Sequence, residues 1–206
     1  MKYLEYFGRR ENTFNKSFEL IKKHINGGKK YLIVELGTSR SFVSGGFEGC
    51  MNTDPKYWQP NNPESWDWGA GIFTKVFSEN LKGENFIIHT IDPDDNAISI
   101  VNTICNGEKN VNIIKGYSTD FLNNLNEKID FLYMDHMESS EEACIKHLED
   151  SKIIVERNLI SPNGIILIDD IGDNVTNTKG KYSIPYLLEN GFVTIIHEYQ
   201  VLLMKI

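Results

Sequence analysis

Apolar residues recur at helical spacing near the start of the chain, at Phe14, Phe18, Ile21 and Ile25. This spacing predicts an amphipathic helix that covers one side of a core, because residues three or four positions apart share a helix face. Asn12 is a candidate N-cap for this helix, and the glycine pair at 27–28 is expected to end it.

Five continuous apolar runs follow, at 31–36, 86–91, 111–114, 129–134 and 164–168. Continuous runs, in contrast to alternating ones, are typical of parallel strands that are buried on both faces. The segments between the runs are long enough for crossover helices, notably 140–157. The pattern therefore predicts an α/β fold with a doubly wound, mostly parallel sheet.

The end of the chain has a different pattern. Residues 183–189 predict a short helix that stops at Asn190 and Gly191, and 192–206 contain two apolar runs too close together for a helical crossover. These two runs are expected to pair as an antiparallel hairpin. The hairpin brings the predicted sheet to seven strands.

An unusually long segment separates the first two predicted strands. Its middle part, 52–69, holds all three tryptophans and a cluster of prolines. Long irregular segments inside compact domains are often functional, so we expect a flap at about 44–71 near the ligand, followed by a helix at about 72–81. The aromatic side chains either contact a ligand or pack among themselves to anchor the flap.

The chain has 206 residues and a formal net charge of −8. This length suits a single domain over 1–206. Nucleic-acid backbones are bound by clustered Lys and Arg, so the charge argues against nucleic acid as the main partner. The three cysteines are widely spaced, the N-terminus lacks a signal-peptide pattern, and no run approaches the ~18 apolar residues of a membrane helix. We therefore expect a cytoplasmic protein that does not bind membranes.

Polar residues follow the predicted strands directly, where open parallel sheets bind their ligands. The first strand leads into Glu35, Gly37, Thr38 and Ser39, and the third is followed by Ser118 and Thr119. The second strand ends in Asp92, at the place where a doubly wound fold binds the hydroxyls of a ribose. Two alternatives remain open: Asp92 caps its loop, and Ser118 or Thr119 caps the next helix.

The fourth and fifth strands both end in acids, with Asp135 and His136 after one and Asp169 and Asp170 after the other. Adjacent parallel strands would bring the three carboxylates together, and their repulsion favours a hard divalent cation such as Mg²⁺. Alternatively, one acid holds a substrate hydroxyl and the others face water. Asp135 and His136 are the candidate catalytic residues. His136 is a candidate general base or substrate contact, or else a residue that hydrogen-bonds the backbone behind the site.

Taken in order, these features resemble the class I S-adenosylmethionine-dependent methyltransferases over 31–206. The acid pairs are similar to those of the catechol O-methyltransferases and of the sugar O-methyltransferases related to macrocin O-methyltransferase, and the cephalosporin hydroxylase group is similar too. The resemblance implies a Rossmann-like methyltransferase fold. Two positions depart from the pattern: serines replace loop glycines at 39 and 41, and Glu138 stands where catechol enzymes carry a catalytic lysine.

Residue roles are implied by the same resemblance. Glu35 and Gly37, with Thr38 and Ser39 of the same loop, would lie near the methionine part of S-adenosylmethionine. Asp92 would bind the ribose, and Ser118 and Thr119 would lie near the adenine. The metal ligands would be Asp135, Asp169 and Asp170, with Asp135 also beside the cofactor.

The expected activity is methyl transfer to the hydroxyl of a small-molecule acceptor, such as a sugar, a catechol-like compound or a natural product, with Mg²⁺ as a candidate aid. A homodimer is compatible with this interpretation. Two other functions stay open. An NAD-dependent oxidoreductase also places an acid after its second strand, although the loop at 37–41 lacks the required glycine trio. A non-catalytic S-adenosylmethionine-binding protein would account for Glu138 and the altered loop.

Overall fold

The computed structural model describes residues 1–25, 28–44, 53–70, 72–172 and 178–206. A seven-stranded sheet has the order β3-β2-β1-β4-β5-β7-β6. Its strands are β1 (Tyr31–Leu36), β2 (Phe86–Asp92), β3 (Val111–Lys115), β4 (Ile129–Met134), β5 (Ile160–Ile168), β6 (Phe192–His197) and β7 (Val201–Lys205). The first five strands are parallel, and β7 is antiparallel to both β5 and β6. The predicted fold class and the closing hairpin are confirmed.

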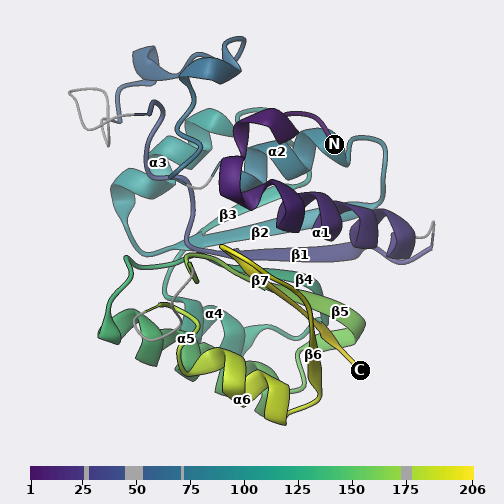
Figure 1. Cartoon of the computed structure of the whole chain (residues 1–206). Helices are drawn as coiled ribbons and strands as arrows, with labels where there is room; N and C mark the ends of the chain where they lie inside the picture. The colour runs from purple at the N-terminus through teal and green to yellow at the C-terminus, as the bar shows by residue number, and fades with distance from the viewer. Residues whose placement is uncertain (26–27, 45–52, 71, 173–177) are drawn as a thin grey trace.

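Helices cover both faces of the sheet (Figure 1). One layer contains α1 (Glu11–His24), α2 (Phe73–Asn80) and α3 (Asp95–Ile104), and the other contains α4 (Ser118–Asn124), α5 (Glu141–Glu156) and α6 (Ser183–Glu189). The strand order reverses at β1: the chain adds β2 and β3 on one side of β1 and then β4 and β5 on the other. The carboxyl ends of β1 and β4 therefore form the switch point at which open α/β sheets bind ligands. No helix of the described segments is long and apolar enough to cross a bilayer.

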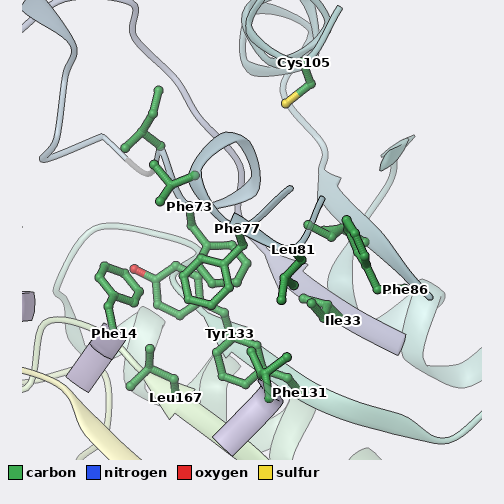
Figure 2. Packing of buried hydrophobic residues seen from close by; sticks show 14 of the residues in the cluster. Phe14, Ile33, Phe73, Phe77, Leu81, Phe86, Cys105, Phe131, Tyr133 and Leu167 are labelled. Carbon is green, nitrogen blue, oxygen red and sulfur yellow. The ribbon is translucent and has the colours of Figure 1, made fainter. Parts of the chain in front are cut away.

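Two hydrophobic cores lie on opposite faces of the sheet because successive strand residues point to opposite sides. Phe131 and Tyr133 of β4 join the core under α1 and α2, whereas Leu132 and Met134 join the core under the other layer. Figure 2 shows the aromatic part of the first core, in which Phe14 of α1 and the stacked pair Phe73 and Phe77 of α2 pack against the rings of Phe131 and Tyr133. Burial on both sides explains why the strand runs are continuous.

Three local features differ from the prediction. Arg10 takes the N-cap position of α1 without a side-chain hydrogen bond, and Asn12 instead donates to Glu198. The strand β5 begins four positions before the expected Gly164, because Ile160 already pairs with Ile129 ahead of a register shift. The expected end of α1 at the glycine pair falls partly on 26–27, outside the described residues, and the helix itself ends at His24.

The described part of the flap contains two short 3-10 turns, Pro55–Tyr57 and Pro63–Ser65. Trp66 is fully buried, its ring stacks between Trp58 and Trp68, and its Nε1 donates to the backbone oxygen of Gln59 over 2.8 Å. Trp68 in turn stacks on Tyr6 of the N-terminal segment. The tryptophans therefore anchor the flap to itself and to the start of the chain. Residues 45–52 and 71 of the expected flap lie outside the described residues.

Candidate functional site

The ends of the central strands lie side by side. The Asp135 N–H donates to the Leu36 carbonyl over 2.9 Å, and the Asp169 N–H donates to the Met134 carbonyl over 3.1 Å. These bonds continue the ladder past each strand, so the acids after β4 and β5 meet next to the loop after β1. The predicted convergence of Asp135, Asp169 and Asp170 at one sheet edge is confirmed by their shared contacts, described below.

Gly37 begins the loop after β1 with a φ of +86°, a conformation that glycine adopts without strain. A Cβ at this position would lie 2.6 Å from the Cα of His136 and 2.7 Å from its backbone nitrogen. The two loops after β1 and β4 thus touch through their backbones. This close approach requires the glycine that the sequence placed here.

Asp92 ends β2, and its carboxylate accepts the backbone N–H of Thr38 over 3.1 Å and of Asp94 over 2.9 Å. Asp92 therefore does cap its loop, as the first alternative expects. The carboxylate nevertheless borders two adjoining pockets, so it also faces open space. Burial raises the pKa of Asp92 above its ordinary value, although the two backbone donors oppose this shift.

The larger pocket has a volume of about 510 Å³ and lies between the loops after β1, β2, β3 and β4. It is bordered by Gly37, Ile91, Asp92, Pro93, Tyr117, Ser118, His136, Met137, Glu142 and Lys146. Tyr117 is 61% exposed and Met137 is 38% exposed, which leaves two apolar side chains uncovered at its rim. A carboxylate beside uncovered apolar surface suits a ligand with both a polyol part and a planar ring.

Ser118 and Thr119 occupy the first turn of α4. Ser118 borders the larger pocket, whereas the hydroxyl of Thr119 accepts a hydrogen bond from Lys146 over 3.2 Å. The N-cap of α4 is Tyr117, and its side chain makes no capping bond. The helix-cap alternative for Ser118 and Thr119 is therefore wrong, and of the two only Ser118 is among the residues bordering the pocket.

Glu35 lies below the loop rather than at a pocket wall. Its side chain is fully buried and accepts hydrogen bonds from the hydroxyls of Thr74 and Thr90. Burial raises the pKa of Glu35 to about 8, against the opposing effect of these two donors. Thr38 and Ser39 follow in the loop and are both buried, and Thr38 borders the smaller pocket.

The smaller pocket, of about 60 Å³, shares Gly37, Asp92, His136 and Met137 with the larger one. Its other walls come from the acid loops, from the loop after β1 and from the flap: Thr38, Arg40, Gly69, Ala70, Asp135, Asp170 and Lys179. The Oγ1 of Thr38 is buried and has no hydrogen-bond partner within the described residues. Such a group is costly unless a ligand or water satisfies it.

Two basic side chains form ion pairs with the three acids. Arg10 binds Asp169 over 2.8 Å and Asp170 over 3.3 Å, and the Lys179 Nζ lies 2.9 Å from both an Asp135 oxygen and an Asp170 oxygen. Burial and the nearby Asp135 raise the pKa of Asp169, while Lys179 and Tyr199 outweigh burial and lower the pKa of Asp170. The pKa of Lys179 is raised because its two carboxylate partners outweigh its burial.

The acid cluster does not fit the expected magnesium ion. A hard cation needs carboxylate oxygens that are free to coordinate it, and here Arg10 and Lys179 already contact those oxygens. No group of three His, Cys, Asp or Glu side chains arranged to hold a metal occurs among the described residues. The geometry thus gives no support to the predicted metal, and no chemical step is assigned to one.

His136 faces Asp150 of α5, with 3.0 Å between Nε2 and Oδ2. Its ring stacks on that of His147 at a centroid distance of 4.2 Å, and its backbone oxygen lies 3.1 Å from the His147 Nε2. Burial lowers the pKa of His147 well below its ordinary value, which keeps that ring neutral. His136 therefore sits between a buried carboxylate and a buried neutral ring while also bordering both pockets.

Sequence reasoning missed three side chains of this region: Arg10, Lys179 and Asp150. Arg10 precedes the first helix and Lys179 lies in a polar loop, so neither belongs to a motif at a strand end. Of the three, only Asp150 could have been found from the sequence pattern, because it lies three positions after His147 and so shares a face of the predicted helix with it. Glu138, at the position expected to carry a lysine, forms an exposed ion pair with Arg40.

Comparisons with known proteins concern the fold. No protein-family profile and no curated protein matches the sequence. Among solved structures, a candidate methyltransferase from Streptococcus mutans in complex with S-adenosylhomocysteine has a TM-score of 0.60 at 12% identity, with 94% of this chain and 97% of that chain covered.

Two further solved structures are similar to a comparable degree. An rRNA methylase from Streptococcus thermophilus has a TM-score of 0.56 at 11% identity, covering 94% of this chain and 96% of that one. A candidate O-methyltransferase from Klebsiella pneumoniae has a TM-score of 0.56 at 10% identity, with 93% of this chain and 80% of that chain covered. The chain therefore has the Rossmann-like fold of class I methyltransferases.

Proposed function

We propose that this chain, as one domain over 1–206, is an S-adenosylmethionine-dependent methyltransferase that acts on the hydroxyl of a small-molecule acceptor. The observation that carries the proposal is the larger pocket at the switch point of the sheet, with Asp92 on one side and exposed apolar surface on the other. A structure of the same fold is solved with S-adenosylhomocysteine, which supports this choice of ligand.

The residues fit the cofactor part by part. The carboxylate of Asp92 would accept the two ribose hydroxyls, and Tyr117 and Met137 would cover the adenine ring, with Ser118 at its edge. The methionine part would lie at Gly37 and Thr38, where the unpartnered Thr38 hydroxyl could be satisfied. Ser39 continues the same loop. Glu35 and Thr119 would not contact the cofactor directly: Glu35 is buried below the loop, and Thr119 accepts a hydrogen bond from Lys146.

The smaller pocket would receive the acceptor. S-adenosylmethionine supplies an electrophilic methyl group on a sulfonium, so the protein mainly has to align the acceptor oxygen and exclude water. Gly69 and Ala70 of the flap close one side of this pocket. Asp135 and His136 border it, and one of them would take the proton that the acceptor hydroxyl releases.

A small acceptor is favoured over RNA by two observations. The smaller pocket, which would receive the acceptor next to the methionine part, has a volume of only about 60 Å³. The chain also carries a net charge of −8, which opposes binding to a phosphate backbone. One solved neighbour is an rRNA methylase and another a candidate O-methyltransferase, so the fold itself is compatible with both substrate classes.

Thermal melting with S-adenosylhomocysteine tests the proposal. A ligand that binds the native state must raise the melting midpoint, so the wild type is expected to show a concentration-dependent shift. Asp92→Ala should abolish the shift. The matched control is Asp95→Ala, which removes an exposed carboxylate three positions away whose ion pair with Lys115 lies at the surface, and it should keep the wild-type shift.

The same melting assay, together with a turnover assay, separates the alternatives. A shift with NADH but not with S-adenosylhomocysteine would contradict the proposal in favour of an oxidoreductase. A full S-adenosylhomocysteine shift in folded Asp92→Ala would remove the ribose assignment. Binding without turnover across a broad panel of hydroxyl acceptors would instead indicate a non-catalytic cofactor-binding protein.

A further inference from the structure

Each carboxylate oxygen of Asp169 and Asp170 has a donor of this chain in contact with it. The Oδ1 of Asp169 lies 2.8 Å from the Asp170 N–H and 3.1 Å from the Arg10 Nε, and its Oδ2 lies 2.6 Å from the Tyr133 hydroxyl and 2.8 Å from the same Nε. The Oδ1 of Asp170 contacts the Tyr199 hydroxyl and the Arg10 Nη2. A divalent cation at Asp169 would have to displace buried, bonded groups.

The side of the cluster that faces the smaller pocket is held by one lysine. Lys179 is 2% exposed, and its Nζ bridges the Asp135 Oδ1 and the Asp170 Oδ2 at 2.9 Å each. It also lies 3.3 Å from the Asp135 carbonyl oxygen. Two carboxylates from neighbouring strand ends thus share one ammonium, in the position where they would share a metal.

The turn that carries Lys179 is fixed by its surroundings. The thiol of Cys144 on α5 donates to the Thr178 carbonyl over 2.9 Å, and the Lys181 N–H donates to the same oxygen over 3.0 Å. Gly180 packs so tightly that a Cβ there would lie 2.3 Å from Ile184 and 2.6 Å from Ile171. The neighbours of Lys179 in the turn are therefore held by hydrogen bonds at Thr178 and by close packing at Gly180.

We infer that Lys179 is the built-in cation of the acceptor site: its ammonium takes the place of a divalent metal between Asp135 and Asp170 and holds Asp135 for the acceptor hydroxyl. Lys179 is thus a positioning residue, and the methyl transfer would need no divalent ion. The role of Lys179 toward the acceptor hydroxyl rests on the proposed function. Its effect on cation binding at Asp135 and Asp170 does not, and it is measured separately.

The experiment is a Mn²⁺ titration of the cofactor-free chain, followed by electron paramagnetic resonance of free Mn²⁺. The wild type is expected to show no saturable binding below millimolar Mn²⁺. Lys179→Gln, which removes the charge and leaves a shorter polar side chain, should leave Asp135 and Asp170 free and tighten Mn²⁺ binding at least tenfold. Lys179→Arg keeps the charge and should stay like the wild type.

The matched control is Lys181→Gln, two positions away, whose ammonium pairs with the exposed Glu141 and should not affect the metal. Circular dichroism and the S-adenosylhomocysteine shift establish whether each variant is folded. Saturable Mn²⁺ binding by the wild type that disappears in Asp135→Asn would overturn the inference, and this result does not depend on any lysine variant. A folded Lys179→Gln that binds no Mn²⁺ would overturn it as well.

The two proposals fail in different ways. Loss of the S-adenosylhomocysteine shift in the wild type would remove the proposed function while leaving the Mn²⁺ result interpretable. If the wild type shows the S-adenosylhomocysteine shift and also binds Mn²⁺ saturably through Asp135, the methyltransferase proposal stays in place and the inference about Lys179 is removed.

Discussion

The imidazole of His136 and the carboxylate of Asp150 lie 3.0 Å apart, and Asp150 is fully buried on the inner side of α5. A buried carboxylate is costly unless a partner compensates it. Neither Asp150 oxygen has an aligned hydrogen bond within the described residues, so the short contact with His136 is its main compensation. This pair links the acceptor side of the site to the helix behind it.

His136→Ala is therefore expected to destabilise the chain by about 3–5 kcal/mol, because it leaves a buried charge without its partner. Urea unfolding measures the effect. Asp150→Asn should cost stability in the wild-type background but restore part of it in the His136→Ala background, since there it removes the uncompensated carboxylate. An equal cost in both backgrounds would show that the two side chains are not coupled.

Arg10 and its neighbour Arg9 offer a matched pair. Arg10 binds the fully buried Asp169, whereas Arg9 is exposed and lies over the Tyr199 ring at 4.1 Å. We expect Arg10→Ala to cost about 3–5 kcal/mol in urea unfolding, by removing the partner of a buried carboxylate. Arg9→Ala should cost no more than about 1 kcal/mol, the range of an exposed cation–π contact. Similar losses in the two variants would contradict the importance of the buried ion pair.

Alanine substitutions at Gly37 and Gly83 allow the cost of backbone strain to be distinguished from the cost of a steric clash. Both have positive φ angles, +86° and +93°, but a Cβ at Gly83 would meet nothing within 4 Å, while one at Gly37 would press on the backbone of His136. Gly83→Ala should thus cost only about 1–2 kcal/mol, from the left-handed conformation alone. Gly37→Ala should cost more and also abolish the S-adenosylhomocysteine shift, because it displaces a loop that borders both pockets. Retention of the full shift in a folded Gly37→Ala would contradict this assignment.

The strands could be predicted from the sequence because burial on both faces gives continuous apolar runs. The bounds of β1 and β4 agree with the predicted runs for this reason. The sequence pattern predicts the start of β5 too late, because the turn-forming residues Pro162 and Asn163 interrupt the apolar run. Pairing with β4 overrides that local signal.

The meeting of the acids could also be predicted, because parallel strands end at the same edge of a sheet. Their charge compensation could not. Arg10 reaches Asp169 across 159 positions and Lys179 reaches Asp135 across 44, and no spacing in the sequence encodes such contacts. Repulsion among carboxylates indicates that a cation is needed, but it does not distinguish a metal from a side chain.

Glu35 is a further buried acid of the site, and its environment differs from those of Asp150 and Asp169. It lies opposite Thr90 on β2 and opposite Tyr133 on β4, and the hydroxyls of Thr74 and Thr90 contact its Oε2. No basic side chain pairs with Glu35 among the described residues. Burial without a cation explains why the pKa of this carboxyl rises to about 8.

This raised pKa makes the stability of the chain depend on pH. Between the ordinary pKa of 4.5 and about 8, the folded chain keeps a proton on Glu35 that the unfolded chain has released. The unfolded state then binds fewer protons, so the free energy of unfolding falls as the pH rises, at up to about 1.4 kcal/mol per pH unit for one proton. Glu35→Gln keeps the shape and an acceptor for the two threonines, so it should remove this part of the slope.

Urea unfolding at intervals from pH 5 to 9 measures the slope in both chains. The wild type should lose stability relative to Glu35→Gln as the pH rises toward 8, and the difference should become constant above the folded pKa, where both states have released the proton. Glu127→Gln, at an exposed position in the loop before β4, serves as the matched control and should reproduce the wild-type slope. Parallel curves for the wild type and Glu35→Gln would show that Glu35 is ionised in the folded chain, and the charge compensation of the whole strand-end region would then have to include it.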